Sequence, residues 1–315
     1  MSRSMNAATL TCLCAATATL TGCGGGGDDP PAPPPAAAYT QADVLLIAQL
    51  GALTASISQM RVPDAVAYFG GFLAAASTNN GGTTSIDAAC PGGGTQASTV
   101  TKSAVRAGFA TGDSIRTTYA SCVVEGITFN GTVTLTLRAP IANLSLADFR
   151  VDYGAEMTGF SMQQGNLATV HDGRIDAISE LDNANVLTST FQVPANATYG
   201  NASGGFSMQF LAGATFAETR TASTSSGTLA MNANVSINTS ATPIPLQIST
   251  GPALTGPLTS AVLDPTGGTL NTKDTTLNLA TSTVFSGSTA TVSGDTDQNG
   301  SLDLTFASSW SALVN

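Results

Sequence analysis

One short segment near the C-terminal end has the residue types and spacing of a calcium-binding loop. Oxygen-bearing side chains recur at every second position, and a glycine between them permits a sharp turn. The pattern is incomplete, because Phe306 stands where a bidentate glutamate closes a helix-flanked calcium loop. A weak structural calcium site and a polar hairpin turn at Asn299-Gly300 therefore both stay open. The candidate ligands are Asp295, Asp297, Asn299, Ser301 and Asp303.

Residues suited to acid–base or nucleophilic catalysis are few. His171 is the sole histidine, and its neighbour Asp172 points to the opposite face if both lie in a strand. The pair Asp172-Gly173 also favours a surface turn at this point. Gly112-Asp113-Ser114 has the residues that begin one type of esterase block, but Ala168 stands where that block places an acid before the histidine. We therefore expect no catalytic residues, no enzymatic activity and no cofactor other than structural calcium.

The cysteines and the N-terminus indicate export. Residues 7–21 form a short apolar segment behind Arg3, which is typical of a secretory signal. The segment ends in Leu20-Thr21-Gly22-Cys23, which resembles a bacterial lipobox. The resemblance implies cleavage after residue 22, acylation of Cys23 and, because Gly24 follows it, sorting to the outer membrane. Which face of that membrane the protein occupies stays open.

Two cysteines remain after the signal and the anchor. Cys90 and Cys122 lie in the exported part of the chain, with no Cys-x-x-Cys motif and no histidine nearby. An even pair in an oxidising compartment predicts a disulfide rather than a metal or redox site. The intervening length of chain gives such a bond about 3–4 kcal/mol of stabilisation in the chain-entropy account.

The next segment, residues 23–38, is rich in glycine and proline and has no means of forming a core. It predicts a tether that reaches up to about 45 Å from the membrane. The chain has 20 acidic and 10 basic residues and a net charge of −10. This balance argues against a nucleic-acid partner, because phosphate binding needs a basic surface.

Residues 39–315 are predicted to form one β-rich domain that starts with helices. The spacing predicts a helix over residues 40–60, with Thr40 and Asp43 as its capping box and an apolar face at Leu46, Leu50, Leu53 and Ile57. A second, shorter helix is expected over residues 64–76. The proline-rich stretch 243–257 marks a candidate boundary inside the domain.

From residue 85 onward the apolar period changes to two. Leu229, Met231, Ala233, Val235 and Ile237 alternate with small polar residues, which indicates antiparallel strands with one buried face. Turns are expected at five dipeptides that end in glycine, namely Asn130-Gly131, Asp172-Gly173, Ser226-Gly227, Gly267-Gly268 and Asn299-Gly300. The predicted fold class is mainly β: an antiparallel sheet, as a curved half-barrel or a sandwich, with one or two N-terminal helices packed on it.

Taken together, the lipobox, the tether, the helix, the cysteine pair and the terminal Asp-x-Asp-x-Asn-Gly turn resemble uncharacterised proteobacterial outer-membrane lipoproteins. The resemblance implies a β-rich envelope protein attached to the membrane through its lipid and assigns no activity.

Two functions stay open. The first is a non-enzymatic envelope protein with a structural or surface-interaction role and an unknown protein partner. The second is a carrier of an apolar ligand, held in a pocket between the sheet and the N-terminal helix. Ordinary core packing is the alternative interpretation of the residues that would line this pocket, which are Met157, Phe160, Met208, Phe210 and Met231.

Overall fold

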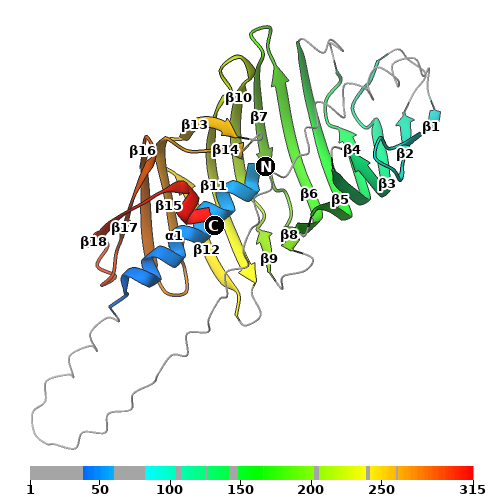
Figure 1. Cartoon of the computed structure of the whole chain (residues 1–315). Coiled ribbons are helices and arrows are strands. Elements are labelled where there is room, and N and C mark those ends of the chain that lie inside the picture. Colours follow the sequence, from blue (N-terminus) through cyan, green and yellow to red (C-terminus); the bar gives the residue numbers. More distant parts are fainter. Residues whose placement is uncertain are drawn as a thin grey trace, which may run out of the picture.

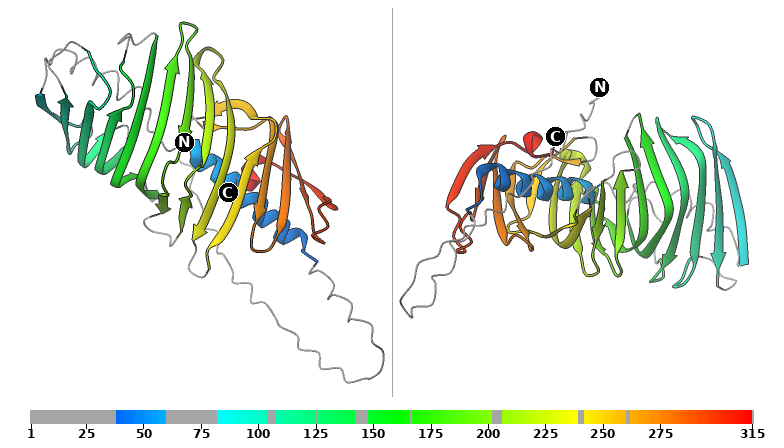
Figure 2. Two further views of the ribbon diagram at one scale, coloured as in Figure 1. Left: turned by 180° about the vertical axis from the view of Figure 1, so that it is seen from behind. Right: turned by 90° about the horizontal axis from the view of Figure 1, so that it is seen from below.

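The computed structural model describes residues 38–59, 82–103, 108–124, 126–141, 148–165, 167–201, 206–238, 242–259 and 262–314. Within these ranges the chain forms one large antiparallel sheet, with helix α1 (Gln41–Gln59) on one of its faces (Figure 1). The predicted mainly β fold with an N-terminal helix is confirmed. Of the two architectures left open, the structure has the curved single sheet, which bends round α1 (Figure 2). Cys23, the signal segment and the predicted helix over residues 64–76 lie outside the described residues.

The first strands form a meander in which each strand pairs with the next one along the chain. Hairpin connections keep such neighbours antiparallel and adjacent. These strands are β1 (Gly82–Ala89), β2 (Thr95–Lys102), β3 (Ser114–Val124), β4 (Ile127–Leu137), β5 (Phe149–Gln164), β6 (Leu167–Leu181) and β7 (Val186–Gln192).

The middle strands continue the meander with interruptions. β6 pairs with both β7 and β8, and β11 pairs with both β9 and β10, so two strand positions are each filled by two short strands. β12 and β13 likewise share one edge of β11. The proline-rich stretch is thus part of the sheet, which continues across it. The elements are β8 (Ala197–Asn201), β9 (Ser207–Phe210), β10 (Thr215–Thr221), the 3₁₀ turn η1 (Ala222–Thr224), β11 (Ser226–Asn238), β12 (Ile244–Thr250), β13 (Leu254–Thr259) and β14 (Val262–Leu263).

The last strands follow from β12 and complete the trough around α1, with β1 and β18 at opposite ends of the molecule (Figure 1). A short C-terminal helix packs against α1, and the Gln49 side-chain amide donates a hydrogen bond to the Ala312 carbonyl at 3.2 Å. These elements are β15 (Gly267–Asp274), β16 (Leu279–Ser286), β17 (Thr289–Gly294), β18 (Leu304–Ser308) and α3 (Trp310–Val314).

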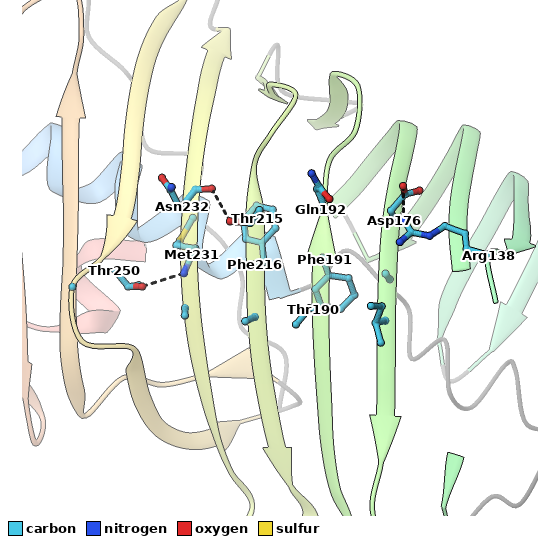
Figure 3. Close-up of a pocket in the computed structure, with 15 residues that line it drawn as sticks. Arg138, Asp176, Thr190, Phe191, Gln192, Thr215, Phe216, Met231, Asn232 and Thr250 are labelled. Carbon is cyan, nitrogen blue, oxygen red and sulfur yellow. Dashed lines mark hydrogen bonds and ion pairs between the residues drawn. The ribbon is translucent and has the colours of Figure 1, made fainter. Parts of the chain in front are cut away.

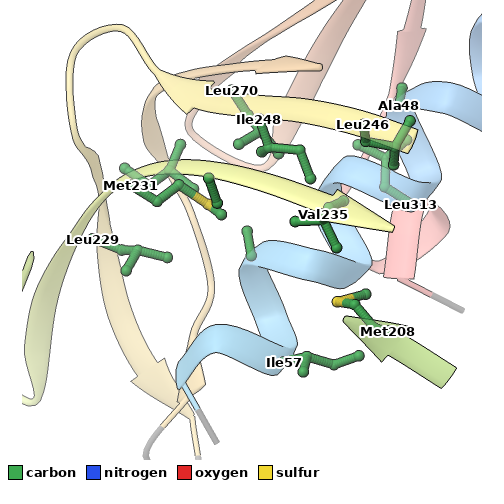
Figure 4. Close-up of a cluster of buried hydrophobic side chains, with 14 of the residues drawn as sticks. Ala48, Ile57, Met208, Leu229, Met231, Val235, Leu246, Ile248, Leu270 and Leu313 are labelled. Atoms are coloured by element: carbon green, nitrogen blue, oxygen red, sulfur yellow. The ribbon is translucent and has the colours of Figure 1, made fainter. Parts of the chain in front are cut away.

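The sheet has an apolar face, which carries α1, and a polar face on the other side. The apolar face holds three clusters of buried side chains, and the largest lies beneath α1. Figure 4 shows Ile57 of α1 near Met208 of β9 and Val235 of β11 within that cluster. Along β11 buried and less buried positions alternate, as the sequence predicts for a strand with one buried face.

Helix α1 begins at the predicted capping box. The Asp43 carboxylate accepts a hydrogen bond from the Thr40 backbone N–H at 2.8 Å, and Thr40 Oγ1 accepts one from the Asp43 N–H at 3.3 Å. This reciprocal arrangement satisfies backbone donors that a helix start leaves without partners.

The predicted buried face of α1 is wrong in part. Ile57 is buried, but Leu46 is 37% exposed, and Leu50 and Leu53 are only half-buried. The helix instead buries a face of mostly small residues, comprising Val44, Ile47, Ala48, Gly51, Ala52 and Ala55. Small side chains let the helix backbone approach the sheet closely, and that gain in contact outweighs burial of the leucine stripe.

Two glycines mark how closely helix and sheet approach. A Cβ on Gly51 of α1 would collide with Oγ1 of the buried Thr272 of β15. A Cβ on Gly294 of β17 would lie 2.5 Å from a methyl carbon of Val44. The helix therefore rests directly on the strands at these points.

Several predicted turns are wrong, because their glycines lie in strands. Asn130-Gly131 is inside β4 and Asp172-Gly173 is inside β6, beside irregularities in strand register. Gly131 and Gly173 have φ values of +90° and +111°. A β-bulge needs the same left-handed backbone as a tight turn, so the two give the same sequence signal.

The three other predicted turns differ in outcome. Gly267-Gly268 begins β15, and Ser226-Gly227 begins β11 directly after its turn. The turn at Asn299-Gly300 is confirmed.

The predicted disulfide is confirmed. Cys90 and Cys122 are bonded with their Cα atoms 5.3 Å apart, within the ordinary range for a disulfide. The bond joins the connection between β1 and β2 to β3, beside a register shift between Tyr119 and Cys122. It therefore fixes the end of the sheet that lies farthest from α1 (Figure 1).

Among the described residues, α1 alone is long and apolar enough to cross a membrane by length and composition. Half of that stretch is buried in the structure, as in the core helix of a folded domain.

We expect Gly51→Ala to lower the free energy of unfolding by about 1–3 kcal/mol, the usual cost of overpacking a core. Alanine is the better helix former, so without the collision with Thr272 the same change would be stabilising. Urea unfolding of Gly51→Ala, Thr272→Ala and the double variant measures this coupling. The exposed control Leu46→Ala should change stability by less than about 0.5 kcal/mol. A more stable Gly51→Ala variant would contradict the close approach.

Candidate functional site

The polar face has a hollow of about 490 Å³ over β6, β7, β10, β11 and the end of β12 (Figure 3). Its volume is in the range of small-molecule sites. We call this site the hollow. Exposed side chains at its rim are Thr190, Gln192, Thr215 and Asn232.

Strand register places the polar groups of the hollow in one row. Asp176 lies opposite Gln192, Gln192 opposite Thr215, and Thr215 opposite Asn232. The next residues along the same strands, including Phe216 and Met231, are in the core. Alternation therefore turns this row toward solvent while its neighbours hold the strands in place.

One end of the row is a group of ion pairs. The Arg138 guanidinium contacts Asp176 at 2.5 Å and Asp152 at 2.8 Å, and Arg174 contacts Asp176 at 2.8 Å. Two cations thus face two carboxylates, and the charges balance. Because these groups are partly exposed, each pair adds at most about 1 kcal/mol to stability.

The floor of the hollow is apolar and shallow. Ala217 and Ala230 lie directly opposite one another on β10 and β11, and Thr190 of β7 separates them from Ile178 of β6. The small alanine side chains leave the space that forms the hollow.

A second polar group is buried on the apolar face of the same strands. Ser179 and Ser189 share a hydrogen bond of 3.1 Å, and Ser189 lies opposite Glu218. Glu218 contacts Arg220 at 3.3 Å, which in turn donates a hydrogen bond to the Gln59 carbonyl at the end of α1. This row interrupts the apolar face and ties α1 to β10.

Tyr153 lies at the β5 end of that buried row. Burial raises the pKa of Tyr153 to about 12, while interaction with the Ser179 hydroxyl opposes the rise and the Glu218 charge adds to it. The phenol is therefore neutral at physiological pH and suits a structural role.

The predicted calcium ligands lie together in the turn between β17 and β18. Asp295 accepts hydrogen bonds from the Asn299 and Gly300 backbone N–H groups at 3.1 and 2.9 Å. Asp303 accepts hydrogen bonds from the Thr296 N–H and hydroxyl, which lower the pKa of its carboxyl. The Asp297 carboxylate accepts a hydrogen bond from the Asn299 side-chain amide, and the Asn299 side-chain oxygen accepts one from the Ser301 backbone N–H.

These carboxylates therefore serve the turn itself. No group of three or more acidic, histidine or cysteine side chains suited to a metal occurs among the described residues. Calcium binding here stays a prediction.

His171 is buried and not on a surface turn as predicted. Its ring packs edge-on against Tyr199, with ring centres 4.9 Å apart, and shares a hydrogen bond of 3.3 Å with Thr169. Asp172 accepts a hydrogen bond from the Gly159 N–H across the neighbouring strand. The bulge near Gly173 lets β6 continue, which carries His171 into the core.

The structure does not bring the five predicted pocket residues together. Met157 and Phe160 belong to the cluster beside the disulfide. Met208, Phe210 and Met231 belong to the cluster beneath α1. All five are buried as core side chains.

Sequence reasoning missed the hollow. Its residues come from several strands that extend over more than 100 positions, from Arg138 to Gly251, and only strand register aligns them. Exposed polar residues on predicted strands mark the polar face but do not locate a site on it.

Comparisons with known proteins found no matching family model, no similar curated protein and no similar solved structure.

We expect Tyr153 to make stability depend on pH in alkaline solution. Its pKa is higher in the folded state than the ordinary value near 10, so its contribution is present below pH 10 and is lost between about pH 10 and 12. The loss amounts to about 2 kcal/mol. Denaturant unfolding across this range measures it, with Tyr153→Phe as the comparison. Identical pH profiles for the two proteins would contradict the buried phenol.

We expect Asp295→Ala to destabilise the protein by about 2 kcal/mol even in EDTA, because two backbone donors lose a charged partner. The exposed Asp297→Ala variant should lose less than about 1 kcal/mol. Thermal unfolding with EDTA and with calcium measures both. If Asp295→Ala lowered stability in calcium but not in EDTA, Asp295 would act by binding the metal, and its role in holding the turn would be contradicted.

Proposed function

We propose that this chain is a non-enzymatic, lipid-anchored protein of the bacterial outer membrane that binds a partner through the polar face of its sheet. The observation that carries the proposal is the difference between the two faces. One face is apolar and carries α1 over its C-terminal half, and the other exposes a row of uncharged polar side chains around the hollow.

The point of attachment supports this arrangement. The Tyr39 N–H donates a hydrogen bond to the Thr296 carbonyl at 2.9 Å, and the Tyr39 hydroxyl donates one to the Leu277 carbonyl. The tether therefore joins the domain at the end that holds β16 to β18. An anchor at Cys23 would therefore attach at the end of the domain opposite the disulfide-bonded end of the sheet (Figure 1).

The close packing of α1 favours this function over the apolar carrier. Gly51 and Gly294 leave no room for a methyl group between helix and sheet at their contacts with Thr272 and Val44. The residues suggested for a carrier pocket are divided between two packed clusters.

Lipidation is tested with Cys23→Ala in a Gram-negative host. We expect the wild-type chain to incorporate labelled palmitate and to sediment with outer membranes, because several acyl chains give stable anchoring. Cys23→Ala should lose the label and the membrane association. Cys14→Ala, a cysteine inside the signal segment, is the matched control and should behave as the wild type. Wild-type protein without the label, recovered in the soluble fraction, would contradict the proposal.

A further inference from the structure

The side-chain amides of the hollow are available to a ligand. No hydrogen bond joins the Gln192 or Asn232 amide to another residue in the part of the chain that the structure describes. Each amide offers a donor and an acceptor, and the Thr190 hydroxyl adds a group that does both. The Thr215 hydroxyl donates to the Asn232 carbonyl at 3.5 Å and offers its oxygen as an acceptor. The ligand they suit therefore has many groups that both donate and accept.

The spacing of the row narrows the class of ligand. Gln192, Thr215 and Asn232 stand on successive strands, which are about 5 Å apart in a sheet. This repeat is close to the length of one sugar unit. The apolar pair Ala217 and Ala230 suits the C–H surface of a sugar ring, and the hydroxyl of Thr190 lies beside that pair on β7.

The charges beside the hollow do not favour an anionic ligand. Arg138 and Arg174 face Asp152 and Asp176, so two positive and two negative charges balance and leave no net positive charge to attract a phosphate or carboxylate. The site offers neutral hydrogen-bonding groups.

A peptide added as an extra strand does not fit either. β7 pairs with β6 and β10 on its two edges, and β10 pairs with β7 and β11. The backbone groups of these strands are already used, so a ligand meets side chains alone.

We propose that the hollow is a binding site for a short neutral oligosaccharide. This inference rests on the proposed function and names the partner class of the polar face. Gln192 and Asn232 hold the sugar hydroxyls, and Ala217 and Ala230 keep the floor low enough for a ring to enter.

The test uses the purified full-length protein, in a detergent without a sugar headgroup where the protein is lipidated. Maltotriose, cellotriose, mannotriose and triacetylchitotriose are the probes, and trigalacturonic acid is the anionic comparison. Saturation-transfer NMR detects binding, and calorimetric titration measures Kd. We expect saturable binding of at least one neutral probe and weaker binding of the anionic one.

Variants then locate the site. Gln192→Ala and Asn232→Ala should each weaken binding by about three- to tenfold, the effect of losing one or two hydrogen bonds. Ala230→Trp should abolish binding by filling the hollow. Asn234→Ala, an exposed residue on the same face of β11 outside the hollow, should bind as the wild type does. Circular dichroism checks that each variant is folded.

Three outcomes would overturn the inference: no saturable binding of any neutral probe, stronger binding of trigalacturonic acid, or an equal loss in Asn234→Ala. An unlipidated protein that binds a neutral probe would contradict the anchor and leave the saccharide site standing. An anchored protein that binds no probe would contradict the saccharide site and leave the lipid anchor standing.

Discussion

The contact between α1 and the apolar face of the sheet is the constraint on which the fold depends. A single sheet with one apolar face must cover that face, and in the described part of the chain α1 covers it over the C-terminal half of the sheet. Gly51 and Gly294 permit a contact close enough to exclude even a methyl group. The strands beyond β7 bend round this helix, and the trough they form holds the largest of the three buried clusters (Figure 2).

Covering one face also determines what the other face can do. Because helix and core occupy the apolar side, the alternate residues of β6, β7, β10 and β11 face solvent. The exposed positions are filled with threonine, glutamine and asparagine, and the few charges are paired among themselves. Such a surface recognises a ligand by hydrogen bonds and shape, with little contribution from long-range charge.

Local signals predicted the elements well. Thr40 and Asp43 predicted the start of α1, alternation predicted β11, and two exported cysteines predicted the disulfide. Each of these features depends on neighbours in sequence or on a simple count. The predicted turns at Gly131 and Gly173 were wrong, because a β-bulge and a tight turn both need a glycine with positive φ. At these two positions the structure has bulges.

Long-range packing was not predictable from local pattern. The leucine stripe of α1 is the more apolar face, yet the small-residue face is buried, because close approach depends on the shape of the sheet. The hollow needs the register of four strands, which no single strand specifies. The predicted calcium ligands do meet in one turn, and the structure adds that their carboxylates hold backbone N–H groups.

Hydrogen exchange of the purified protein, followed by mass spectrometry, tests the role of α1 most directly. If the helix is the cover of the sheet, its amides exchange as slowly as those of β11 and β15 and become exposed together with them in denaturant. If α1 exchanges rapidly while the strands remain protected, the helix is not part of the core. In that case the division of the sheet into a covered face and a free face would be wrong.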